Sequence, residues 1–226
     1  MVKQTNLDGV KKTALLFLNL DPKPTQIPFI IDHPFFDSIV LSDGKNIFNL
    51  FENPVAFKNY KEEVARRITS GNLDTIFALI LTKYYLAFLK YSKPYLSKKD
   101  FDTYFAYSWI SAENPNQDAN VSIRTLISWF KAANKKYLMS ESELRYYNSL
   151  SDTVTVYRGV ARGRANKEGL SWTGNIKTAQ WFANRFNSKG EILVGKIHKE
   201  DIFAYFNGRN EDELVCNSSK IELVRF

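Results

Sequence analysis

The sequence has little of the chemistry that builds metal sites or disulfide frameworks. It has one cysteine, Cys216, and two histidines, His33 and His198, which lie far apart in the chain. A single cysteine excludes an intramolecular disulfide and fits a reducing compartment. Zinc sites draw mostly on clustered cysteine and histidine, so we expect no metal site.

Long apolar runs are also missing. The most apolar stretch, residues 76–89, is interrupted by Lys83 and is too short to span a membrane, so it predicts a buried helix. Residues 1–8 contain no apolar signal core, which favours a cytoplasmic protein over a secretory precursor. A secreted mature form, already freed of its signal, stays open as the alternative. We expect no membrane partner.

What the chain does have is enough apolar surface for a sizeable core. Of its 226 residues, 44% are apolar and 15% aromatic, which suits one large domain or two small ones. The net charge of +7 is spread out, with 19 basic against 15 acidic residues in 1–150 and 12 against 9 in 151–226. Such diffuse charge favours acidic proteins, nucleotides or nucleic acid without selecting among them, and a solvated basic surface is the plain alternative.

The hydrophobic period changes near residue 151, from helical to strand-like. We expect a short strand over 13–19, proline-rich loops over 21–55, and a mainly helical region from there to residue 150. The helical region should contain helices from 56 to Ser70, from about 73 to Ser92, over 98–108, after a Ser122 cap, and over 141–150. Strands are expected over 153–160, 191–198, 213–217 and 220–225, with one helix over about 176–187.

This order of elements predicts an α+β fold. Residues 1–150 would complete the core or contact a target, and 151–226 would form a β region. The change at 151 is a structural boundary that need not separate two domains, because the β region is small for a core of its own.

Three short segments of the β region place polar residues at strand edges. Val154–Gly159 is an apolar run that ends on Arg158, Leu170–Thr173 contains two hydroxyls, and Asn210–Val215 begins with two glutamates two residues apart. An arginine fork donates two parallel hydrogen bonds to phosphate, which lysine cannot copy. The plain alternative for the arginine is a surface ion pair with a nearby acid.

In a β-strand, side chains two residues apart lie on the same face. This spacing occurs between the polar residues in each of the other two segments. Ser171 and Thr173 share a face, as do Glu211 and Glu213 if that end is extended. Two carboxylates so placed can divide acid and base roles. A half-exposed strand edge and a solvated acidic turn are the structural alternatives.

Arginine, then serine, then Glu-x-Glu resembles the mono-ADP-ribosyltransferases of the arginine–serine–glutamate class, over roughly residues 153–225. The resemblance implies a split β-sandwich that binds NAD in a cleft, with the helical region packed on it. It also implies transfer of ADP-ribose from NAD to a protein, with release of nicotinamide. A glutamate two residues before the last one, as here, implies arginine as the acceptor.

The resemblance assigns NAD contacts and catalysis to particular residues. Arg158 would contact NAD, with Gly159 and Gly163 allowing close backbone approach to the ligand. Ser171 and Thr173 would brace the pocket.

The acidic loop would supply catalysis and acceptor recognition. Glu213 would hold the ribose 2′-hydroxyl and stabilise the oxocarbenium-like transition state, and Glu211 would orient the acceptor guanidinium. Tyr205, Phe206 and Asn210 would contact the acceptor protein.

The chain departs from the family pattern in two places. The usual Ser-Thr-Ser reads Ser-Trp-Thr, and Arg158 precedes Ser171 by 13 residues, a shorter gap than in the toxins of this class. The helical arm that covers NAD between these motifs must therefore be reduced, or supplied by residues 56–149. Compact members resemble transferases that bacteriophages deploy against host proteins, which implies a host protein target in the cytoplasm. The Rho-modifying bacterial exoenzymes are similar in size and basic, but secreted.

Two other functions remain open on the sequence. The chain could be an NAD glycohydrolase, with water as the acceptor. It could also be an inactive module of this fold that binds a protein or nucleic acid through its basic surface. The presence of both Glu211 and Glu213 favours the enzyme.

Overall fold

The computed structural model describes residues 3–42, 44–50, 52–162, 169–185 and 189–224. It divides into two compact units, Met1–Phe101 and Asp102–Phe226, and the division falls within helix α5 (Lys98–Ser111). The period change near residue 151 is therefore a change of secondary structure inside the second unit. The helices that follow α5 belong to the same unit as the strands.

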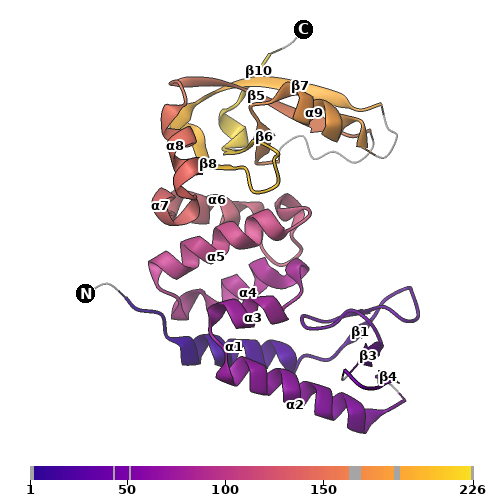
Figure 1. Cartoon of the computed structure of the whole chain (residues 1–226). Coiled ribbons are helices and arrows are strands. Elements are labelled where there is room, and N and C mark those ends of the chain that lie inside the picture. Colours follow the sequence, from indigo (N-terminus) through magenta and orange to yellow (C-terminus); the bar gives the residue numbers. More distant parts are fainter. Residues whose placement is uncertain (1–2, 43, 51, 163–168, 186–188, 225–226) are drawn as a thin grey trace. The chain divides into compact units, whose positions relative to one another are not determined.

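The first unit is mainly helical, with two small antiparallel hairpins (Figure 1). Its helices are α1 (Leu7–Leu18), α2 (Pro54–Ser70), α3 (Leu73–Leu79) and α4 (Tyr85–Ser92), and its strand pairs are β1 (Lys23–Pro24) with β2 (Ile31–Asp32) and β3 (Val40–Ser42) with β4 (Ile47–Asn49).

Two expectations for this unit are wrong. The strand expected over 13–19 is part of α1, which begins where the Asn6 side chain accepts a hydrogen bond from the Gly9 amide at 3.0 Å. The helix expected from 73 to 92 is interrupted, because the backbone at Ile80 is extended and α4 starts at Tyr85. In both places a continuous apolar run hid the true period.

The second unit combines the helices that follow α5 with a β region. The elements are α6 (Ile123–Ala132), α7 (Lys135–Leu138), α8 (Glu141–Ser149), β5 (Thr153–Val160), β6 (Ser171–Thr173), α9 (Ile176–Ala183), β7 (Glu191–His198), β8 (Ile202–Phe206), β9 (Glu213–Cys216) and β10 (Glu222–Leu223). Ser122 caps α6 as expected, accepting from the Thr125 amide. The α+β class is confirmed, with β5 and β7 at their expected bounds and β9, β10 and α9 shorter than expected.

All six strands of this unit form one antiparallel sheet in the order β10-β7-β5-β6-β9-β8. β5 and β7 pair along their whole length, from Thr153 opposite His198 to Val160 opposite Glu191. By contrast, within the described residues β5 and β6 pair at a single position, Tyr157 opposite Thr173. The sheet thus consists of two three-stranded halves joined at one point.

Helix α9 lies against β5 and β7 on the first of these halves (Figure 1). The contact is so close at Gly159 that a Cβ atom there would stand 2.0 Å from the Ala179 carbonyl oxygen and 2.6 Å from the Ala183 amide nitrogen. A glycine is therefore required at this position of β5 by helix packing.

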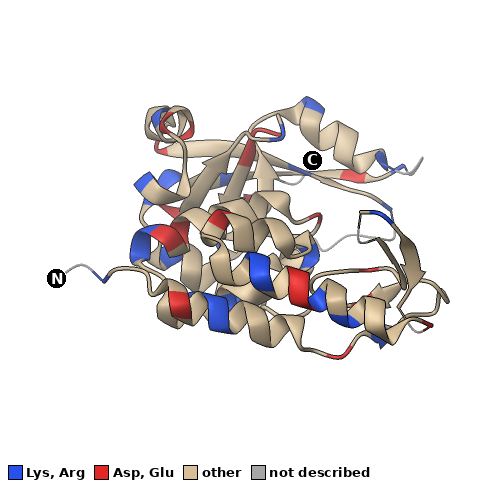
Figure 2. Ribbon diagram, turned by 60° about the horizontal axis from the view of Figure 1, so that its bottom comes forward, with Lys and Arg blue, Asp and Glu red and all other residues tan. Residues whose placement is uncertain are grey.

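Charged residues of both signs follow one another along the helices (Figure 2). On α2, for example, Lys58 pairs with Glu62 at 3.8 Å and Arg66 pairs with Glu63. Among the residues that the structure describes, no helix has the length and apolar character needed to cross a bilayer.

Candidate active site

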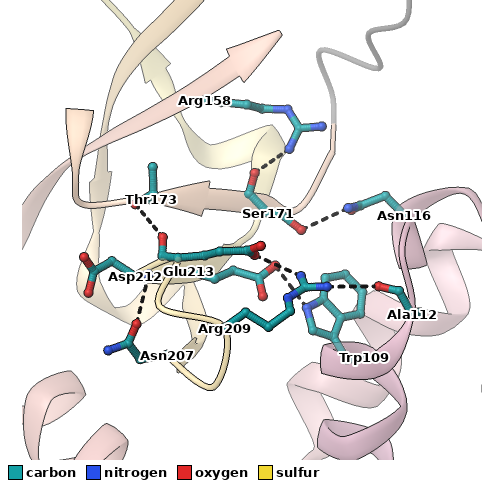
Figure 3. A network of polar contacts seen from close by, with 11 residues as sticks. Trp109, Ala112, Asn116, Arg158, Ser171, Thr173, Asn207, Arg209, Asp212 and Glu213 are labelled. Carbon is teal, nitrogen blue, oxygen red and sulfur yellow. Dashed lines mark hydrogen bonds and ion pairs between the residues drawn. The ribbon is translucent and has the colours of Figure 1, made fainter. Parts of the chain in front are cut away.

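The three polar segments found in the sequence meet at the junction between the two halves of the sheet. β6 pairs with β9 so that Thr173 lies opposite Glu213 and Ser171 opposite Val215, while β5 reaches β6 at the single pair described above. Arg158, Ser171 and Glu213 consequently belong to one polar network (Figure 3).

Glu213 begins β9 and is 7% exposed. Its Oε1 accepts a hydrogen bond from the indole Nε1–H of Trp109 at 3.1 Å, and its carboxylate also accepts one from the Ser171 hydroxyl. Burial raises the pKa of Glu213, and the two hydrogen bonds work against that rise because they favour the anion. The site thus holds a desolvated carboxyl group whose charged form is opposed by burial and favoured by its two hydrogen-bond donors.

Trp109 comes from α5 and is fully buried, edge-on to Phe130 of α6 at a centroid distance of 4.9 Å. This packing fixes the indole so that its N–H is directed at Glu213 (Figure 3). Sequence reasoning missed Trp109, because a tryptophan in a helix carries no sign of the polar partner that its nitrogen will meet.

The guanidinium of Arg158 crosses from β5 to the other half of the sheet. Its Nη1 donates to the main-chain carbonyl oxygen of Ser171. Burial lowers the pKa of Arg158 and the negative charge of Glu213 raises it. A Cβ atom at Gly169 would lie 2.3 Å from Nη2 of this guanidinium, so the glycine leaves the space that the arginine occupies.

Ser171 lies between these charged groups and is oriented from a third direction. Its Oγ accepts from Nδ2 of Asn116 at 3.0 Å, and Oδ1 of Asn116 accepts from the Leu170 amide at 2.7 Å. Asn116 belongs to the polar loop that follows α5, where no sequence pattern distinguishes it from its polar neighbours. The Ser171 hydroxyl also acts on Glu213 as a hydrogen-bond partner that lowers the pKa of this carboxyl, against the larger effect of burial.

Thr173 braces the acidic loop and does not touch a carboxylate of the glutamate pair. Its Oγ1 donates to the carbonyl oxygen of Glu211 at 3.0 Å and accepts from the Asn175 amide at 3.0 Å. Asn210 and Asp212, on either side of Glu211, adopt left-handed backbone with φ of 56° and 48°. Asparagine and aspartate tolerate this conformation better than other side chains, which explains their presence at the turn.

Glu211 lies in a different environment from Glu213. Its side chain is 25% exposed, and Oε2 forms an ion pair with Nη2 of Arg209 at 3.0 Å. The structure therefore gives the two carboxylates separate partners: a buried indole and serine for Glu213, and a half-exposed guanidinium for Glu211.

Two residues expected to touch the acceptor protein are buried in β8. Tyr205 is 5% exposed and Phe206 is 2% exposed. Tyr205 instead stacks on Tyr146 and donates from its hydroxyl to Oδ1 of Asp212 at 2.8 Å, which anchors the acidic loop. The acceptor role expected for these two aromatics is therefore not supported, whereas Asn210 is exposed and its role stays a prediction.

The expectation for Gly159 also needs correction. The space beside its Cα is taken by the backbone of α9, so its role is helix packing and not close approach of a ligand. Gly163 lies outside the described residues.

No group of three or more histidine, cysteine, aspartate or glutamate side chains within the described residues is arranged to hold a metal ion. Comparison with known proteins found no match to a family model, a curated protein or a solved structure.

Proposed function

We propose that this protein is an NAD-dependent mono-ADP-ribosyltransferase that modifies a host protein on arginine and releases nicotinamide. The observation that carries the proposal is the contact network of Arg158, Ser171 and Glu213. The sequence singled out these residues in three separate segments, and the fold joins them through one serine.

The environment of Glu213 supports the proposal that this residue acts on the ribose of NAD. In this chemistry the bond between nicotinamide and the ribose breaks, and positive charge develops on the ribose carbon. A fixed anion, held by Trp109 and Ser171 in a desolvated place, stabilises that charge without needing to reorganise. Arg158, on the other half of the sheet, would bind the pyrophosphate of NAD through its planar fork.

The division of the sheet into two halves supports the proposal of a split β-sandwich. A split β-sandwich needs two small sheets that separate at the NAD site. Here the halves β10-β7-β5 and β6-β9-β8 meet at one residue pair, and the polar network lies at that meeting. The short gap between Arg158 and Ser171 reduces the helical arm that covers NAD in this class. In this proposal α5 and the loop after it replace that arm, because they bring Trp109 and Asn116 to the site.

The different surroundings of Glu211 support arginine as the acceptor. Its half-exposed carboxylate already binds a guanidinium, that of Arg209, at 3.0 Å. An incoming arginine is a poor nucleophile until a nearby base draws off a proton, and Glu211 is placed for that task.

The test measures nicotinamide release and protein labelling on the same samples. Wild-type protein, Glu211→Gln and Glu213→Gln are incubated with labelled NAD and a host cell lysate. Glu211→Gln should lose transfer to protein and retain hydrolysis, because water needs no guanidinium base, and Glu213→Gln should lose both. Glu222→Gln, the same change at an exposed position of β10, is the matched control and should lose neither.

Three results would contradict parts of this proposal. Equal loss of both activities in Glu211→Gln would remove the separate role of that carboxylate. Hydrolysis by the wild type with no labelled protein in the lysate would favour an NAD glycohydrolase. Absence of nicotinamide release would overturn the enzymatic proposal altogether.

A further inference from the structure

Arg209 occupies the position at which an acceptor arginine would have to bind. It lies on the loop between β8 and β9, two residues before Glu211, and its Nη2 stands 3.0 Å from the Glu211 carboxylate. Its Nη1 donates to the carbonyl oxygen of Ala112 at 3.4 Å, at the end of α5. Figure 3 shows the contact between this guanidinium and the Ala112 carbonyl.

The same guanidinium also acts on the second carboxylate. The positive charge of Arg209 stabilises the ionised form of Glu213, the residue to which the proposed function assigns the sugar. Arg209 thus pairs with Glu211 and acts on Glu213 through its charge, while 38% of its side chain remains exposed.

The loop that carries Arg209 is held in place by its own contacts. The Asn210 amide donates to the carbonyl oxygen of Asn207 at 2.9 Å, and the Asp212 amide donates to Oδ1 of Asn207 at 3.2 Å. The Asn207 amide in turn donates to Oε1 of Glu143 on α8 at 2.8 Å. These bonds fix the backbone on both sides of Arg209, so its position next to Glu211 is built into the turn.

We propose that Arg209 is itself an acceptor, so that the protein ADP-ribosylates its own Arg209 when no target arginine displaces it. This inference rests on the proposed function. In the step, the bond between the ribose C1′ and the nicotinamide nitrogen breaks, and nicotinamide leaves with the electron pair. A nitrogen of the Arg209 guanidinium supplies the pair for the new bond to C1′, and the proton that it loses passes to Glu211.

Two properties follow from this geometry. The reaction is intramolecular, so the fraction of chains labelled per minute does not depend on protein concentration. It is also self-limiting, because the product places two phosphates and an adenosine on the loop that must receive a target.

The experiment uses the full chain with NAD labelled in its adenylate part and no other protein. Peptide mass spectrometry locates the label, and the readout is label on the chain per nicotinamide released. Arg209→Lys keeps the positive charge but not the guanidinium, and should release nicotinamide while the label on the chain falls to the level found with Glu213→Gln. Arg145→Lys is the matched control, since Arg145 is a 73% exposed arginine that pairs with Glu141 at 3.7 Å, and should leave the ratio unchanged.

Each outcome bears on the proposal. Label on Arg209 at a concentration-independent rate supports it. Nicotinamide release with label elsewhere, with no label, or with undiminished label in Arg209→Lys overturns it and leaves the proposed function standing. A rate per chain that rises with protein concentration overturns the intramolecular step. Absence of nicotinamide release overturns both this inference and the proposed function.

Discussion

Replacing Glu213 by glutamine should stabilise the protein while abolishing its chemistry. The carboxylate is 7% exposed, and burial raises its pKa because the charged form loses its hydration. Glutamine has nearly the same shape, and its amide can still accept from Trp109 and hydrogen-bond to Ser171. The substitution thus removes a buried charge and leaves the packing and the hydrogen bonds in place.

The size and sign of the stability change follow from linkage. Below the ordinary glutamate pKa of 4.5 both states of the wild type are protonated, so wild type and variant should unfold with similar free energies. As pH rises, the unfolded chain loses this proton first, because the folded pKa is the higher one, and the wild type loses stability until the folded group also ionises. Above that pH we expect the variant to be more stable by on the order of 1–2 kcal/mol, the usual gain when a functional strain is removed.

The assay pairs thermal unfolding over a pH series with NAD cleavage. In a chain of this size each kcal/mol corresponds to about 2–4 °C in Tm, and loss of one preorganised electrostatic group corresponds to about 10²–10³ in rate. Equal Tm values for wild type and Glu213→Gln at neutral pH would refute the raised pKa of Glu213. Near-normal turnover in the variant would refute the catalytic role, whatever the Tm.

Three further substitutions test other parts of the site. Arg158→Lys should weaken NAD binding about tenfold in isothermal titration, equivalent to about 1.4 kcal/mol, because lysine lacks the planar fork, and unchanged affinity would make Arg158 structural. Trp109→Phe removes a donor to Glu213 and should shift the acid limb of the pH–rate profile to higher pH, since the hydrogen bond favours the anion; an unmoved limb contradicts this. Gly159→Ala should destabilise the chain by about 2–3 kcal/mol, because its Cβ would meet a backbone oxygen at 2.0 Å, whereas Gly174→Ala, with no atom nearer than 3.7 Å, should change the unfolding free energy by under about 0.5 kcal/mol.

Some strands were predicted correctly because the local order of their residues is enough to indicate a strand. β5 and β7 are runs of β-branched and apolar residues bounded by polar turns, and both appear at their expected bounds. The first helix was missed because its local pattern conceals its helical period. Its core residues Val10, Ala14 and Leu18 recur at helical spacing, but a continuous apolar run between them conceals that spacing.

The motifs of the site could be predicted from the sequence, but the contacts that support them could not. Arg158, Ser171 and Glu213 stood out because each lies at the edge of an apolar, strand-like run. Trp109 and Asn116 reach Glu213 and Ser171 from 104 and 55 residues away in sequence, so tertiary packing alone brings them there.

For two aromatic residues the sequence suggested a contact that their burial does not support. Tyr205 and Phe206 adjoin the acidic loop in sequence, which suggested contact with an acceptor. On β8 both side chains are buried, and only the packing of the sheet against its helices decides this.

Among the described residues β5 and β6 share one pair, and this has a mechanical consequence. A strand ladder resists rotation in proportion to the hydrogen bonds along it, and here the resistance is least along the line between the two halves of the sheet. Arg158 stands on one side of that line, and Ser171 and Glu213 stand on the other, with the guanidinium contact to Ser171 spanning it. A few degrees of rotation about this line would change the distance between the arginine and the glutamate while each half kept its own hydrogen bonds. In the proposed function, such a rotation would admit a dinucleotide between the two halves without requiring any strand to unfold.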